Sequence, residues 1–185
     1  MSTTAANVRV AVTGAVYNAP LATPLPSTAI VALNAAFLAR EIGYLTEDGI
    51  TQAINEDSSD IKAWQNADIV RKIRTSQDLT YAFAMLETSP LTLETYYGNY
   101  TAATADSGVA QITGAALGHK AWVLHVIDGL ARIRLVVPDG EITERGETVM
   151  VNGEALSYPI TITAYPDASG VKAYVYLDTD VTVSA

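Results

Sequence analysis

The sequence has no cysteine, only two histidines and only eleven lysines and arginines in 185 residues. Without cysteine the chain forms no disulfide bonds, thiolate metal sites or cysteine nucleophiles. No run approaches the roughly 18 apolar residues that a membrane-spanning helix needs, so we expect no contact with a membrane. The N-terminal stretch VRVAVTGAVYNA faintly resembles a signal peptide, but Gly14 interrupts its apolar run. We therefore do not expect secretion.

Basic residues are outnumbered by twenty acidic ones, which gives a formal net charge of −9. A protein that grips nucleic acid needs clustered cations to displace counterions from phosphate. The only basic run here is short and contains Arg71, Lys72 and Arg74. We expect these three side chains to be mostly neutralised by neighbouring acids or to face away from any channel.

The charges are unevenly distributed along the chain. Residues 1–40 hold two arginines and no acid, whereas residues 136–185 hold eight acids and two cations. Two interpretations stay open: the two regions complement each other between subunits, or an acidic soluble surface has a chance bias.

Motifs that carry chemistry are missing. His119 and His125 have no third ligand at metal spacing, so ordinary strand histidines are the better interpretation. The acids Glu56, Asp57 and Asp60 superficially suggest a calcium loop, but the central glycine and distal glutamate are absent. There is no glycine-rich phosphate loop and no GxSxG motif. We therefore expect no metal, no cofactor and no enzymatic activity.

Apolar residues make up 49% of the chain and the mean hydropathy is +0.19, which is ample for a core. This hydropathy is somewhat high for a small soluble monomer, so part of the apolar surface is expected to face other subunits. Trp64, Trp122 and ten tyrosines would suit stacking on sugars or bases, but packing in a core or an interface is their default use.

Alternating apolar and polar residues predict several antiparallel strands. In SQDLTYAFAMLE the residues Leu79, Tyr81, Phe83 and Met85 share one face. KAWVLHVIDGLARIRLVVPDG reads as a hairpin that reverses at Asp128-Gly129.

The C-terminal part of the chain continues this pattern. LSYPITITA alternates from Leu156 to Ala164, and Asn152-Gly153 before it signals a reversal. Pro159 cannot donate a ladder hydrogen bond, which predicts an edge strand or a bulge there. The stretch ITITAYPDASGVKAYVYLD reads as a last hairpin.

The best helix signal is TSPLTLETYYG, where Ser89 suits an N-cap, Pro90 the first turn and Gly98 the C-terminal end. So short a helix must pack on the sheet to be stable. A second short helix is indicated near residues 34–40, ended by Gly43.

These elements predict a mainly β protein: an antiparallel β-sandwich or barrel with about seven or eight strands and one short flanking α-helix. We expect an N-terminal arm over 1–30, partly extended, with one possible strand at Val8–Val16. A β domain follows over 31–178 with long loops at 46–64, where GITQAIN is strand-like, and at 99–118. Residues 179–185 form a C-terminal tail.

Several segments together resemble a known family in order and spacing. GYLTEDG, DIKAW, MLET, PDGEITERGE and TAYPDASGVKAY resemble segments of the major tail proteins, or tail tube proteins, of long-tailed, non-contractile bacteriophages. The similarity looks closest to phages of actinobacteria. It covers about residues 43–178, with an interruption near 100–118.

This resemblance implies a fold and a function. Such proteins form a β-sandwich or barrel with a flanking helix, similar to the tubes of contractile tails and type VI secretion. Six copies form a ring by continuing one sheet from subunit to subunit, and rings stack around the tape measure protein. Tail terminator and baseplate proteins are further partners, and DNA passes through the lumen without specific binding. The protein would be made in the host cytoplasm and end in the virion.

Two sets of residues are candidate contacts in such a tube. The long loop predicts inter-ring contacts at Glu47, Asp48, Glu56, Asp57, Asp60 and Trp64. The last hairpin predicts an inter-subunit sheet edge at Tyr158, Pro159, Ile160, Tyr174 and Tyr176.

Ring size and charge are consistent with a DNA conduit. If each subunit gave four strands, six would close about 24 strands, and at ~4.8 Å spacing and a tilt near 40° the backbone diameter would be about 48 Å. About 38 Å would remain inside the side chains, which admits duplex DNA. Six subunits would carry 6 × −9 = −54, a charge that repels phosphate.

Other functions compete with this interpretation. The same architecture would serve the tube of a tail-like bacteriocin or a secretion system. A carbohydrate-binding β-sandwich would use the tryptophans and tyrosines, and an acid-catalysed hydrolase would need a carboxylate pair in a cleft.

Overall fold

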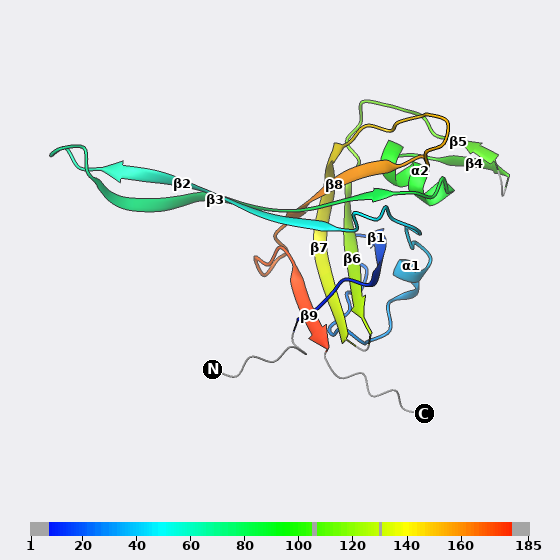
Figure 1. Cartoon of the computed structure of the whole chain (residues 1–185), viewed down its shortest axis with the longest axis horizontal. Helices are drawn as coiled ribbons and strands as arrows, with labels where there is room; N and C mark the ends of the chain where they lie inside the picture. Colours follow the sequence, from blue (N-terminus) through cyan, green and yellow to red (C-terminus); the bar gives the residue numbers. More distant parts are fainter. Residues whose placement is uncertain (1–7, 105–106, 130, 179–185) are drawn as a thin grey trace.

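A computed structural model describes residues 8–104, 107–129 and 131–178 and shows a mainly β, antiparallel fold (Figure 1). One sheet has the order β1-β6-β7-β8-β3-β2, with β9 paired to β7, and β4 and β5 form a separate hairpin. The strands of the large sheet are β1 (Thr13–Pro20), β2 (Thr51–Lys62), β3 (Ile69–Met85), β6 (His119–Asp128), β7 (Ala131–Arg145), β8 (Tyr158–Tyr165) and β9 (Tyr174–Asp178). The remaining elements are α1 (Ala35–Leu38), α2 (Pro90–Tyr97), β4 (Thr101–Thr104) and β5 (Ser107–Val109).

Strand β7 folds the large sheet into a sandwich, because its two halves have different partners. Residues 132–136 pair with β9, while residues 139–145 pair with β8. The layer β1-β6-β7-β9 thereby packs against the layer β7-β8-β3-β2. Their facing side chains form the main core, which holds Val16, Tyr81, Phe83, Trp122, Leu124 and Ile162, among others.

The predicted apolar face of β3 is confirmed. Leu79, Tyr81, Phe83 and Met85 are all buried, and each lies opposite a residue of β8. Trp122 is fully buried, as core packing predicted, and its ring leaves no room for a side chain at position 140. A Cβ on Gly140 would lie 2.8 Å from the Trp122 ring, so glycine is required there.

The edge position predicted for Tyr158–Ile160 is wrong. Strand β8 lies inside the sheet between β3 and β7, and Tyr158 and Ile160 are buried. Pro159 is tolerated because it lies where β7 ends: its carbonyl accepts a hydrogen bond from Gly146 N at 2.9 Å. The irregular register falls on β7, between Ile142 and Glu144, and not on β8. Leu156 precedes the strand and is 37% exposed.

The first strand occupies residues 13–20 and not 8–16, and it is an integral part of the sandwich. Val16 and Ala19 are fully buried, and β1 pairs with β6 along its whole length. Its outer edge is covered by the chain at residues 40–42, where Ile42 N donates to Val16 O at 2.9 Å. Much of the predicted N-terminal arm is therefore part of the folded domain.

Both predicted helices are present, so the described residues contain two short helices where one flanking helix was expected, but α1 ends at Leu38, with Ala39 as its C-cap, and not at Gly43. In α2 the Ser89 hydroxyl accepts from Thr92 N at 3.2 Å, and Gly98 adopts a left-handed φ of +94°. In α1 the side chain of Asn34 caps Ala36 N at 2.9 Å. Helix α1 buries Phe37 against the outer face of the layer that contains β1 and β6.

The two predicted long loops contain strands. Most of 46–64 is β2, the first strand of a hairpin with β3, and 99–118 contains the small hairpin β4–β5. The segment 146–157 between β7 and β8 is a connection with a turn at Asn152-Gly153, as predicted.

Candidate assembly surfaces

The longest feature outside the core is a two-stranded hairpin that projects from the body of the molecule (Figure 1). We call residues 55–78 the arm, because Ile54 and Leu79 form the last strand pair that touches the core. Almost every residue of the arm is exposed. At about 3.3 Å per residue, the strand from Asn55 to the tip at Trp64 reaches about 30 Å.

Cross-strand pairs hold the arm together. Arg74 pairs with Glu56 at 2.9 Å, Lys72 approaches Asp60 at 3.7 Å, and the Ser76 hydroxyl donates to the carboxylate of Asp57 at 3.0 Å. Arg74 and Lys72 are thus partnered by acids, as predicted, whereas Arg71, the third cation of the run, makes no ion pair with the described residues. Exposed ion pairs of this kind contribute about 0–1 kcal/mol each, and a hairpin without a packed face is marginally stable at best.

The arm also exposes large apolar side chains to solvent. Trp64 is 98% exposed, on the turn that Ala63 N closes by donating to Asp68 O at 2.7 Å. Ile61, Ile69 and Val70 flank it and are exposed as well. An apolar cluster on a ribbon that is not packed against its own chain marks an interaction surface.

The outer edge of strand β9 is a second candidate assembly surface. The strand pairs with β7 alone among the described residues, so one row of its backbone groups faces outward. Val175 and Leu177 are 62% and 60% exposed, whereas Tyr174 and Tyr176 stack on each other and pack against the domain. The last predicted strand therefore is a sheet edge, and an uncovered edge invites pairing with another strand.

The turn before β9 is fixed by its own hydrogen bonds. Asp167 accepts from Ser169 N, from Val171 N and from the Tyr174 hydroxyl, the last at 2.7 Å. The hydrogen bond from Val171 N, with those from Tyr174 and Ser169, lowers the pKa of Asp167. The edge strand is presented in one conformation by this turn.

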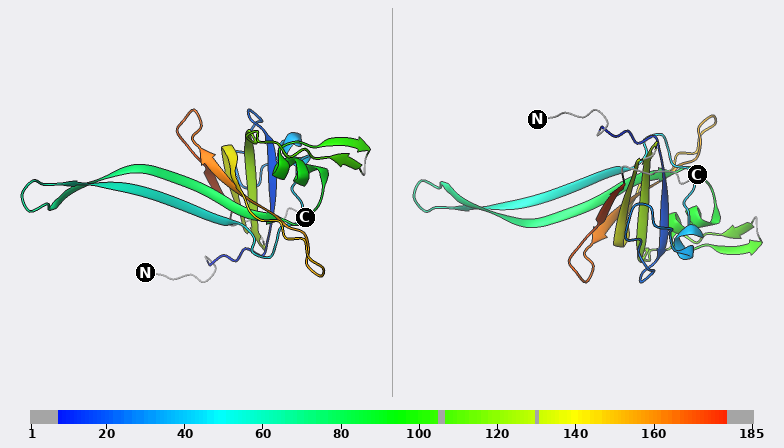
Figure 2. Two further views of the ribbon diagram at one scale, coloured as in Figure 1. Left: turned by 90° about the horizontal axis from the view of Figure 1, so that it is seen from above. Right: turned by 90° about the horizontal axis from the view of Figure 1, so that it is seen from below.

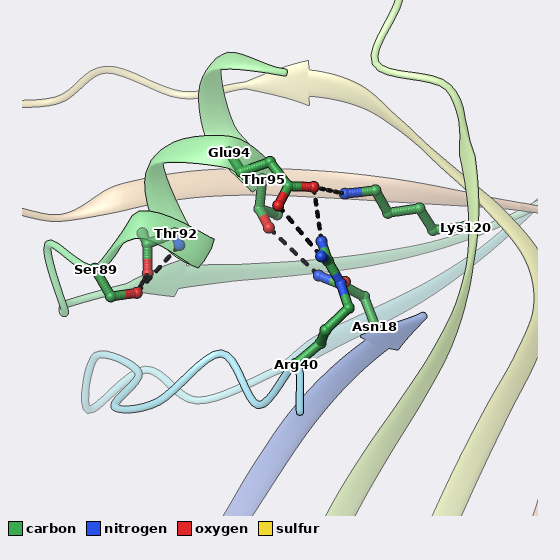
Figure 3. Close-up of polar contacts among 7 residues, drawn as sticks. All are labelled: Asn18, Arg40, Ser89, Thr92, Glu94, Thr95 and Lys120. Carbon is green, nitrogen blue, oxygen red and sulfur yellow. Dashed lines mark hydrogen bonds and ion pairs between the residues drawn. The ribbon is translucent and has the colours of Figure 1, made fainter. Parts of the chain in front are cut away.

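A polar network fastens α2 to the sandwich (Figure 3). Arg40 donates two hydrogen bonds to Glu94, at 2.7 and 3.2 Å, and Lys120 donates a third at 3.1 Å. Fully buried Asn18 joins Arg40 to Thr95. Burial alone would raise the pKa of Glu94, but hydrogen bonds and charges of Arg40 and Lys120 outweigh it and lower that pKa. Arg40 therefore pairs with an acid of its own chain.

His125 and Arg134 form a second buried contact. Arg134 is 4% exposed, and its Nε–H donates to His125 Nε2 at 2.6 Å, so this ring nitrogen carries no proton. Burial, and then the positive charge of Arg134, lowers the pKa of His125 to about 4. Arg134 also donates to the carbonyls of Thr28 and Val31, which ties the segment before α1 to the sheet.

His119 lies on the same face of β6 as His125, because the strand begins at His119 and residues six apart point to the same side, but it lies at the other end of the strand, between two carboxylates. Its Nδ1 is 2.6 Å from Asp139 and its Nε2 is 3.6 Å from Glu141, while the Tyr165 hydroxyl donates to Glu141 at 3.2 Å. His119 and His125 thus have separate surroundings. Among the described residues no cluster of three histidines, cysteines or acids has the geometry to hold a metal ion. No helix within 8–104, 107–129 and 131–178 is long and apolar enough to cross a membrane.

The predicted contact residues fall in different places. Glu56, Asp57 and Asp60 lie on β2 in the arm and Trp64 lies at its tip, but Glu47 and Asp48 lie in a turn before β2, in the body of the domain, where Thr46 N donates to Ala84 O. Tyr174 and Tyr176 lie on the free edge strand. Trp64 and Trp122 share no face, because one ends the arm and the other is fully buried, which disfavours a sugar platform built from both.

In the part of the chain that the structure describes, a ribbon projects without a packed face and β9 pairs with one strand, features that are typical of assembling subunits. Comparison with known proteins shows the family to which the chain belongs. The profile described as phage tail tube protein matches residues 1–185, so the chain belongs to the phage tail tube protein family. It is a structural component of the virion and not an enzyme.

Solved structures show weaker similarity. The "anti-feeding prophage cap (AFP tube terminating cap)" is 11% identical, with a TM-score of 0.45, and the match covers 84% of this chain and 93% of that one. An "Hcp protein" is 8% identical, with a TM-score of 0.33, covering 88% and 96%. Both TM-scores are too low for a detailed comparison. No curated protein is significantly similar in sequence.

Proposed function

We propose that six copies of the subunit form a ring and that rings stack head to tail into the tail tube, with the arm crossing from each ring to the next. The observation that carries the proposal is the arm itself. About 30 Å of ribbon is stabilised by little more than exposed ion pairs, so it needs a surface on another copy.

Ring closure is supported by the free strand edges. The layer β7-β8-β3-β2 offers four strands, the number that gives about 24 in a ring of six and a lumen wide enough for duplex DNA. Strand β2 ends one side of this layer and β9 ends the other layer. Pairing of such edges with a neighbouring copy would satisfy their backbone groups.

The uncovered face of the layer β7-β8-β3-β2 suits the lumen. This face carries the hydroxyls of Thr80, Thr161 and Thr163, which alternate with the core-facing residues. The hydroxyls of Thr143 and Thr163 are hydrogen-bonded to each other at 2.8 Å. Asp139 and Glu141 add carboxylates to the same face of β7. A wall of hydroxyls and acids would let a phosphate backbone pass without binding.

Further partners follow from the family resemblance. A tape measure protein inside the tube and terminator and baseplate proteins at its ends would complete the tail. The host would be an actinobacterium, in whose cytoplasm the subunit is made, and the tail would be non-contractile.

A shortened arm tests the stacking role. Replacing residues 56–77 by Asn-Gly joins Asn55 to Asp78, which are opposite each other in the ladder, through a two-residue turn. We expect the variant to unfold at nearly the same urea concentration as the parent, because the removed residues are almost all exposed and the hydrogen bond from Lys172 to Gln77 O lies at the surface. We expect it to form no tubes by electron microscopy. Deleting only Gln52–Asp60 is less suitable, because it removes the partner of β3 inside the domain. Normal tubes from the shortened variant would contradict the proposal.

A further inference from the structure

We propose that the tip of the arm docks on the connection between β7 and β8 of a second copy of this chain, on a surface formed by residues 144–151. This inference rests on the proposed function, since it names the partner surface of the same arm. We call residues 61–70 the tip and residues 144–151 the receptor surface.

The positions of the two surfaces fit a head-to-tail contact. Subunits stacked in one direction make heterologous contacts, in which one end of a copy meets the opposite end of the next. Figures 1 and 2 show the arm leaving one side of the body, while α2 and the connection between β7 and β8 lie at the other side. Both views agree on this separation, so the tip cannot reach the receptor surface of its own chain.

The receptor surface is apolar at its centre. Val149, Met150 and Val151 are three consecutive large apolar residues, and they are 51%, 75% and 51% exposed. Three such side chains in a row are out of place in an exposed connection unless another surface covers them. The tip supplies matching side chains, since Trp64 is 98% and Val70 is 62% exposed. A tryptophan that becomes buried in a contact commonly dominates its energy.

The base of the receptor surface is fixed before any contact forms. The Tyr96 hydroxyl on α2 donates to Gly146 O at 2.6 Å, and the Thr148 hydroxyl donates to Tyr96 Oη at 3.4 Å. Arg145 donates to Tyr96 O at 3.2 Å. Because α2 holds the segment from both sides of Gly146, little ordering entropy remains to be lost on docking.

A hollow lies beside this base. It has a volume of about 560 Å³ and is lined by Ala82, Phe83, Glu144, Gly146 and Pro159, among others. An indole ring is small enough to enter it. Trp64 therefore has a recess as well as an apolar surface to occupy.

The charges of the two surfaces are complementary. The tip and the residues that follow it, 61–72, hold three cations and one acid, a sum of +2, in a chain of net charge −9. Residues 141–157 hold four acids and one cation, a sum of −3. Among the described residues, Lys62 and Arg71 make no ion pair, and neither do Glu144 and Glu147. Opposite charges without partners on the two surfaces would steer and orient docking.

Disulfide cross-linking tests the contact directly, because the chain has no cysteine of its own. One copy carries Gln65→Cys at the tip, the other carries Met150→Cys, and the two are mixed, assembled and oxidised. We expect about tenfold more cross-linked dimer from this mixture than from a matched mixture of Gln65→Cys with Ser169→Cys, since docking raises the local concentration. Tubes with cross-links only to position 169, or with none to position 150, would overturn the proposal.

A charge exchange gives a second, independent measurement. The pair K62E with R71E should abolish tubes, and adding E144K with E147K should restore them. If the combined variant forms no tubes although every variant keeps the unfolding midpoint of the parent, the proposed contact is also refuted. If the parent protein itself forms no tubes, the proposed function fails, whereas tubes held by an arm docked within its own ring refute only the receptor surface.

Discussion

At the scale of single residues, buried and half-buried charged side chains join segments that lie far apart in the chain. Arg40 and Glu94 are 54 positions apart and Arg134 and Thr28 are 106 apart. The caps at Ser89 and Gly98 were predictable, because a cap depends on three or four neighbouring residues. The Arg40–Glu94 and Arg134–His125 contacts were not, because they depend on which strands become neighbours.

Glu94 should be the most sensitive acid of the domain. The change Glu94→Ala leaves Arg40 and Lys120 half-buried without their shared carboxylate. We expect a loss of about 1–3 kcal/mol, less than for a fully buried pair because solvent screens part of the attraction. Urea unfolding would measure it. Glu154→Ala, in the exposed turn between β7 and β8, is the control, and a similar loss there would contradict the special role of Glu94.

His125 should make the stability of the domain depend on pH. Its pKa is about 4 in the folded chain and about 6.5 when unfolded. Between these values the unfolded chain binds more protons, so stability is full above pH 6.5 and falls as the pH drops towards 4. With allowance for partial exposure we expect about 1–2 kcal/mol.

Unfolding of the parent and of His125→Gln at pH 7 and pH 4.5 would measure this difference. The glutamine can still accept the hydrogen bond from Arg134 but does not titrate. The parent should lose more stability than the variant over this interval, and equal losses would show that His125 does not contribute.

At the scale of elements, local patterns predicted the core strands but not the arm. The residues of β3 from Leu79 onward alternate because one face is buried, and this pattern identified the strand. The arm has no buried face, so Glu56, Ser58 and Asp60 have the composition of a loop, although they form a strand. A better signal would have been the β-branched residues Ile61, Ile69 and Val70 on both sides of the polar turn.

The proline of β8 was misinterpreted for a related reason. The missing N–H of Pro159 does indicate a position without a ladder partner, but such a position also occurs where a neighbouring strand ends. Only the length of β7 decides between the two. The last hairpin was predictable, in contrast, because its alternating residues and its turn signal lie within one short segment.

Strand β9 should be sensitive to charge if it pairs with a neighbouring copy. Val175→Lys places a cation on the exposed face of the edge strand, a device that blocks edge pairing in other proteins. We expect an unchanged unfolding midpoint and a marked loss of tubes by electron microscopy, with Val175→Thr assembling normally. If both variants assemble equally well, the edge of β9 does not pair with a neighbouring copy.

At the scale of the whole molecule, the acidic net charge, the exposed arm with the edge of β9, and the family are all consistent with a subunit of a tail tube. The family was identifiable from several short segments in the right order, although none of them is a catalytic signature. The surfaces that line the lumen, close the ring and stack the rings were not identifiable from the sequence, because they belong to the assembly and not to one chain. The sequence indicated only that some surface must be shared, through its high apolar content.

Because of its negative net charge, the assembled tube should not bind DNA. Six subunits carry 6 × −9 = −54, and Arg74 and Lys72 have acidic partners within the arm. When tubes are sedimented at about 50 mM salt, where weak phosphate contacts are strongest, we expect short duplex DNA to remain in the supernatant. Co-sedimentation that disappears at high salt would contradict this expectation.

Electron cryomicroscopy of the concentrated, purified protein is the most direct measurement of self-assembly. We predict hollow tubes of stacked sixfold rings in which each arm density leaves its own ring and ends on the next. Single particles at every concentration, with the arm folded back on its own domain and the edge of β9 covered by its own chain, would contradict the proposed function.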